Sequence, residues 1–91
     1  MACLLARYSV RDPELFRRIF DSFEVTRFHH GATGHRLLMA DDDRFVVMIE
    51  FPNVAAARTF AHSPERLSAL EDAGVRERDD AVVEDIETLR Y

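Results

Sequence analysis

The chain has 91 residues, 47% of them hydrophobic, which is the composition of a small globular domain and not of a disordered segment. Its net charge is −5 and its twelve basic residues are all arginine, so no broad basic surface is expected and nucleic acid is excluded as a partner. No apolar run approaches the roughly 20 residues of a membrane span. The N-terminus lacks signal-peptide features and Cys3 is the only cysteine, so we expect a cytoplasmic protein without a membrane partner.

The first third of the chain predicts a strand followed by a helix. Residues 2–10 are short and apolar, and they end where Asp12 can cap a helix and Pro13 suits its first position. An apolar stripe with spacings of three and four follows, made by Phe16, Ile19, Phe20 and Phe23. We expect this helix to run to about His30, because Gly31 offers a stop.

A hairpin is expected next, with strands at residues 34–40 and Phe45–Phe51 joined by the acidic turn 41–43. The second of these strands is apolar on both faces. Phe45, Val47, Ile49 and Phe51 share one side, while the other carries Val46, Met48 and a single charge, Glu50. The helices of so small a chain can cover one sheet face, so the second apolar face predicts a second copy of the chain.

The last third predicts a helix in two segments and a fourth strand. Asn53 can cap the first segment, whose apolar side carries Val54, Ala57, Phe60 and Ala61. Ser63 and Pro64 begin the second segment, which stops at Gly74. The strand is expected at residues 82–89, where acidic and apolar residues interleave as on a sheet edge.

The order of elements is therefore βαββαβ, a ferredoxin-like α+β fold. Right-handed crossovers would place both helices on one face of a four-stranded antiparallel sheet. No linker or repeat divides the sequence, so we expect one domain over residues 1–91.

Several segments resemble the dimeric α/β-barrel proteins, in the branch of antibiotic-biosynthesis monooxygenase-like proteins and cyclases. The resemblance rests on caps, turns and core positions at residues 5–10, 16–21, 31–37, 49–51, 55–60, 63–65 and 73–75. It implies a homodimer with two sheets face to face and a pocket between sheet and helices in each subunit. The family includes cofactor-independent oxygenases, haem-degrading enzymes, cyclases and decarboxylases, so the resemblance indicates the fold more strongly than the activity.

The sequence has no tryptophan, so a tryptophan-dependent oxygenase or haem-degrading site does not transfer to it, and we expect no cofactor. We also expect no metal site. His29 and His30 are consecutive on a helix and point about a hundred degrees apart, so they do not share an ion easily. His30 and His35 could converge across the glycine-flanked turn, but no further ligand follows at a recognisable spacing.

Three residues are candidate catalytic groups. Tyr8 should face the helices, where its hydroxyl would donate a hydrogen bond to a carbonyl or phenolate, or simply find a buried partner as a core aromatic. His35 opens the second strand and has a near-neutral ordinary pKa suited to a general acid or base, although a structural role is also open. His62 stands between two helical segments, either over the pocket or as a helix cap. Arg7 should face the other side of the sheet, paired with Glu84 or Glu50.

Two functions stay open. The first is a small secondary-metabolism enzyme, a cyclase or cofactor-independent monooxygenase acting on an aromatic or polyketide-like compound. The second is a non-catalytic dimeric module that binds a ligand or a partner. Phe16, Phe20, Phe23 and Phe60 either line a substrate cavity or fill it, so the helix–sheet space discriminates the two. A regulatory domain of the amino-acid-sensing type fits the topology, but the glycine-containing ligand loop is missing.

Overall fold

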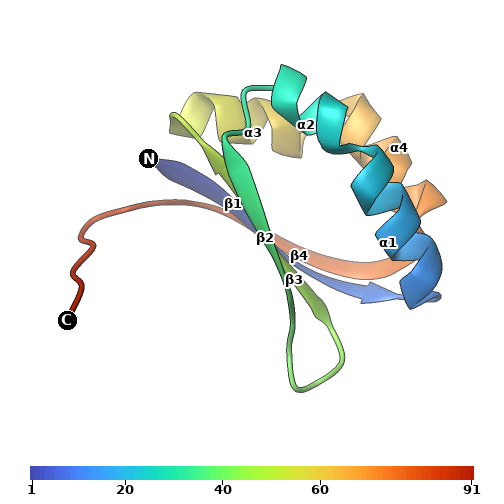
Figure 1. Ribbon diagram of the computed structural model, residues 1–91. Coiled ribbons are helices and arrows are strands. Elements are labelled where there is room, and N and C mark those ends of the chain that lie inside the picture. The colour runs from blue at the N-terminus through green and yellow to red at the C-terminus, as the bar shows by residue number, and fades with distance from the viewer.

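The computed structural model describes residues 1–91 and has four strands in a single sheet and four helices (Figure 1). In chain order they are β1 (Ala2–Val10), α1 (Pro13–Ser22), α2 (Glu24–His29), β2 (Gly34–Met39), β3 (Phe45–Phe51), α3 (Val54–Ala61), α4 (Pro64–Asp72) and β4 (Val75–Glu84). The strands are antiparallel in the order β2-β3-β1-β4, and the helices cover one face of the sheet. The predicted ferredoxin-like α+β fold is confirmed, with β3 as an inner strand and β4 at an edge.

The predicted caps start three of the helices. Asp12 accepts hydrogen bonds from the amides of Glu14 and Leu15 at 3.0 and 3.3 Å. Asn53 accepts from the amide of Ala56 at 2.8 Å, and the Ser63 hydroxyl accepts from the amide of Arg66 at 3.2 Å. Each cap satisfies backbone donors that the first helical turn leaves free.

The first helix is not continuous to His30 as predicted. It breaks at Phe23, whose backbone lies at φ −90° and ψ 3°, and a short second helix follows. The Ser22 hydroxyl donates to the Ile19 carbonyl at 2.8 Å, a side-chain bond of the kind that competes with helix continuation. The break changes the direction of the chain before α2.

The predicted position of the last strand is wrong. β4 spans Val75–Glu84, not residues 82–89, because it starts directly after the turn at Gly74 and pairs along β1 until β1 itself begins. The final ladder pair is Ala2 with Glu84, and only one further bond follows, from the Asp85 amide to the Met1 carbonyl at 3.2 Å. The remaining residues extend away from the sheet (Figure 1).

The core lies between the sheet and the helices. Even-numbered residues of β1 and odd-numbered residues of β3 face the helices and are buried: Ala2, Leu4, Ala6, Tyr8, Phe45, Val47, Ile49 and Phe51. Phe16 and Phe60 pack on them from α1 and α3. The predicted inward face of β3 is therefore confirmed, and Tyr8 faces the helices as expected.

The opposite sheet face, here called the open face, has no helix on it (Figure 1). It carries Cys3 and Leu5 of β1, Leu38 of β2, Val46 and Met48 of β3, and Ala81 and Val83 of β4. Leu38 and Val83 remain 37% and 39% exposed. Apolar side chains thus meet solvent on both edge strands, and those of the inner strands are only half-buried.

Arg7 lies on the open face but does not pair with Glu84 or Glu50 as predicted. Its guanidinium contacts Asp42 of the acidic turn at 3.2 Å. The register explains the difference, because Glu50 and Glu84 pair with Cys3 and Ala2, at the far end of β1.

No helix of the chain is long and apolar enough to cross a membrane.

Candidate functional site

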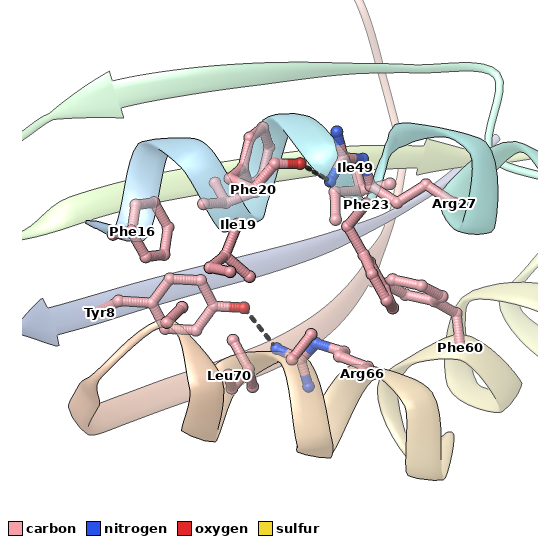
Figure 2. Close-up of a pocket in the computed structure, with 13 residues that line it drawn as sticks. Tyr8, Phe16, Ile19, Phe20, Phe23, Arg27, Ile49, Phe60, Arg66 and Leu70 are labelled. Carbon is pink, nitrogen blue, oxygen red and sulfur yellow. Dashed lines mark hydrogen bonds between the residues drawn. The ribbon is translucent and has the colours of Figure 1, made fainter. Parts of the chain in front are cut away.

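A cavity of about 40 Å³ lies between the sheet and the helices, and eleven of its thirteen lining residues are hydrophobic (Figure 2). The four phenylalanines named from the sequence, at positions 16, 20, 23 and 60, all line it. They also nearly fill it, since one water molecule already takes about 30 Å³ of liquid volume. The space is therefore apolar and small, with few polar groups in its wall.

Tyr8 and Arg66 form one polar position of this wall (Figure 2). The Nη2 atom of Arg66 donates to the Tyr8 hydroxyl oxygen at 2.6 Å. Both residues are buried, each with 3% of its surface exposed. The Tyr8 oxygen is the acceptor in this bond, and no protein acceptor takes the hydroxyl's own proton. That proton can be donated to a carbonyl or oxyanion in the cavity.

Asp80 holds the Arg66 guanidinium in place from the edge strand. Its two carboxylate oxygens accept from Nη1 and Nη2 of Arg66 at 3.0 and 2.9 Å, a bidentate pair. Nη1 also donates to the Ala61 carbonyl at 2.9 Å, and Arg78 donates to Asp80 at 3.1 Å. The cap at Ser63 starts α4 three residues before Arg66, so the end of one helix and the start of the next hold this side chain.

Burial and the charged neighbours together set the protonation states of Tyr8 and Arg66. Desolvation raises the pKa of the Tyr8 phenol, against the lowering effect of the Arg66 charge and its hydrogen bond. Burial alone would lower the pKa of Arg66, but its bonds and attraction to Asp80 and Tyr8 outweigh desolvation and raise it. The site therefore presents a neutral phenol beside a permanent cation whose charge Asp80 balances.

Arg27 of α2 is a second buried guanidinium in the cavity wall, with 4% of its surface exposed. Its Nη1 atom donates to the Phe20 carbonyl at 2.8 Å, and its Cζ lies 4.0 Å from the centre of the Phe20 ring. Unlike Arg66, it forms no ion pair with a carboxylate. Burial lowers the pKa of Arg27, and the carboxylates of Glu24 and Asp21 oppose this effect from a distance.

The DUF1330 family, described as a domain of unknown function, matches residues 4–86. The chain belongs to the DUF1330 family. No curated protein matches this DUF1330 chain. Its fold, however, recurs among solved structures.

SnoaB, a cofactor-independent oxygenase from Streptomyces nogalater, superposes with a TM-score of 0.81 at 18% identity, over 99% of this chain and 97% of that one. Rv0793 from Mycobacterium tuberculosis gives a TM-score of 0.72 at 16% identity, over 98% of each chain. An antibiotic biosynthesis monooxygenase gives 0.64 at 19% identity, over 96% and 100%. These comparisons confirm the likeness to antibiotic-biosynthesis monooxygenase-like proteins, and at such identities they show the fold alone.

Of the three catalytic candidates in this DUF1330 chain, only Tyr8 reaches the cavity. His35 is exposed on β2, where its ring meets the Phe20 ring edge-on at 5.1 Å, and it lines a separate hollow. His62 is exposed as the C-cap of α3 and lines no cavity. The helix-cap alternative for His62 is thus what the geometry shows, while the catalytic roles of all three residues stay predictions.

Neither buried arginine of the DUF1330 site was predicted from the sequence. Arg27 carried a usable signal, because it follows Phe20 by seven residues and Phe23 by four, on the apolar stripe where a charge is unexpected. Arg66 carried a weaker one, as a charge in the first turn after the Ser63 cap. Nothing in the sequence indicated its partner Asp80, because the last strand was predicted to start seven residues too late.

Proposed function

We propose that this protein is a small secondary-metabolism enzyme that acts without a cofactor on an aromatic or polyketide-like compound, as a cyclase or a monooxygenase. The observation that carries the proposal is the free hydroxyl proton of Tyr8, backed by Arg66, in the wall of an apolar cavity. The fold shared with SnoaB, a cofactor-independent oxygenase, supports the same class of reaction.

In this proposal the substrate binds as an enolate or phenolate that has already lost its proton to water, and Tyr8 donates a hydrogen bond to its oxygen. Charge on that oxygen is stabilised by a donor already in place, and the effect is larger where water is excluded. Arg66 strengthens the donor, because it polarises the phenolic oxygen at 2.6 Å. Both candidate reactions, ring closure and oxygen insertion, pass through such an electron-rich oxygen.

The cavity wall contains no carboxylate and no imidazole. The role that we propose for Tyr8 is therefore to hold and stabilise a substrate oxygen, not to remove a proton from carbon. Binding also requires the wall to open, since a dry cavity that admits benzene has about 150 Å³ and this one has about 40 Å³. Phe20 and Phe23, which are half-buried beside the break between α1 and α2, are the side chains placed to move.

The small cavity also favours the second candidate function, a non-catalytic ligand-binding or partner-binding module. Turnover separates the two. We would incubate the protein with a panel of phenols, naphthols and β-diketones under air, measuring oxygen uptake and analysing products by mass spectrometry. The proposal expects a product with wild type and its loss in a folded Tyr8→Phe variant. A panel without any product, or full activity of Tyr8→Phe, would count against the enzyme.

A homodimer is part of the same proposal. The apolar open face supports it, because exposed Leu38 and Val83 and half-buried Leu5 and Met48 would gain burial against a second sheet. The single cysteine supports a reducing, cytoplasmic setting. Light scattering at micromolar concentration tests the association, and a stable monomer would overturn it.

A further inference from the structure

Arg27 is a buried cation that forms no ion pair, although the carboxylates of Glu24 and Asp21 act on it from a distance. A guanidinium carries several N–H donors, and one of those of Arg27 donates a hydrogen bond to the Phe20 carbonyl. No carboxylate forms an ion pair with it. Removing such a charge from water costs free energy that a partner normally offsets. Arg66, by contrast, has such a partner, because its guanidinium forms an ion pair with Asp80.

The position of Arg27 joins two spaces. It lines the apolar cavity on one side, and on the other it lines a hollow of about 150 Å³ between α2 and the start of β2. Thr33 and His35 also line that hollow, as does one carboxylate, Glu24. The hollow has more polar residues in its wall than the cavity has. A molecule lying across the two would have its apolar part among the phenylalanines and a polar end at Arg27.

A purely structural role accounts for only part of this arrangement. The bond to the Phe20 carbonyl and the stacking on the Phe20 ring hold α2 against α1 across the break at Phe23. A neutral donor would make the same bond without a charge to bury. The planar guanidinium with its remaining donors suits a two-oxygen anion.

We propose that Arg27 binds the anionic group of the ligand, so that the pocket, once its phenylalanine wall opens, takes a small organic acid: an apolar ring in the cavity and a carboxylate at Arg27. This inference rests on the proposed function in so far as the cavity is the ligand site. It adds a specificity residue and a substrate class. Tyr8 then holds a second oxygen of the same molecule, at the other polar position of the wall (Figure 2).

Benzoate and benzamide test the inference, because they share ring and shape and differ in charge. Calorimetric titration of the wild-type protein should give at least about tenfold tighter binding of benzoate, or about 1.4 kcal/mol. The Arg27→Met variant keeps an apolar stem and should lose this preference, while Arg27→Lys should retain part of it. Arg58→Met is the matched control, since Arg58 is exposed and forms no ion pair, and it should behave as wild type.

Equal affinity of wild type for the two compounds, or no binding of benzoate at millimolar concentration, would overturn the inference. So would an unchanged benzoate preference in folded Arg27→Met or, if that variant does not fold, in Arg27→Gln, which keeps a donor but no charge. The binding measurement is independent of turnover. A benzoate preference without any product from the panel would support the role of Arg27 and count against the enzymatic function. Turnover without the benzoate preference would support the enzymatic function and count against the role of Arg27.

Discussion

Arg66 and Asp80 meet through two parallel hydrogen bonds, at 3.0 and 2.9 Å, between a helix start and the edge strand. Their side chains are 3% and 25% exposed, so the pair is largely withdrawn from water. Because Arg66 also contacts Tyr8, this ion pair positions the one hydroxyl that faces the cavity. The ion pair also links the edge strand β4 to α4.

Asp80→Asn should lower the free energy of unfolding by about 3 kcal/mol, because it leaves the buried Arg66 cation without a counter-charge. Asp79→Asn is the control, since Asp79 is exposed, forms no ion pair and precedes Asp80 on the same strand. Its effect should stay within about 0.5 kcal/mol. Urea denaturation measures both, and equal stability of the two variants would contradict the importance of the buried pair.

Stability should fall above pH 10, and Tyr8 should contribute to the fall. Burial raises the pKa of Tyr8 above its ordinary value of 10.0. Above pH 10 the unfolded chain releases this proton while the folded chain keeps it, so the stabilisation is complete below pH 10 and is lost as pH rises toward the folded pKa. The slope is at most about 1.4 kcal/mol per pH unit.

Tyr8→Phe should reduce this alkaline slope, while Tyr91→Phe should leave it unchanged because Tyr91 is fully exposed. Urea titrations at several values between pH 9 and 11.5 measure the slopes. Cys3 titrates in the same range but is present in all three proteins, so the comparison isolates Tyr8. Identical slopes in wild type and Tyr8→Phe would show that the phenol is not held neutral by burial.

Cys3 should react slowly with thiol reagents in the native protein. Burial, and then the charge of Glu50, raise the pKa of Cys3 above its ordinary value of 9.0, so little reactive thiolate exists near pH 8. The pH profile of modification by a chromogenic disulfide measures this pKa. Glu50→Gln should move the profile to lower pH, because Glu50 pairs with Cys3 across β1 and β3. A profile unaffected by that change would remove Glu50 as a cause.

The sequence predicted the fold where pattern and position agree. On β3 the alternation of large apolar residues follows the pleat, so the buried set from Phe45 to Phe51 could be read directly. The caps at Asp12 and Asn53 are local and depend on few neighbours. β4 failed for the opposite reason. Its residues 76–80 are all charged, and their strand conformation comes from pairing with β1, which no local pattern records.

The site was predictable only in its apolar part. The phenylalanine stripe showed which helix face lines the cavity, and strand alternation placed Tyr8 there. Arg66 and Asp80 are fourteen residues apart in sequence and on different elements, so their contact depends on the position of β4, which was wrongly placed. His35 and His62 were candidates because of their imidazole chemistry. The sequence left His62 open between a place over the pocket and a helix cap, and neither histidine lines the cavity.

A charge at the centre of the open face should prevent the proposed dimer. Leu5 lies between Met48 of β3 and Ala81 of β4, in the middle of the apolar surface. Leu5→Glu would have to bury a carboxylate against a second sheet, which costs more than the lost apolar contact. The matched control is Val25→Glu, since Val25 is 65% exposed on α2, on the helical side of the molecule. Light scattering should give a dimer mass for wild type and Val25→Glu and a monomer mass for folded Leu5→Glu. A Leu5→Glu protein that remains dimeric would show that the open face is not the interface.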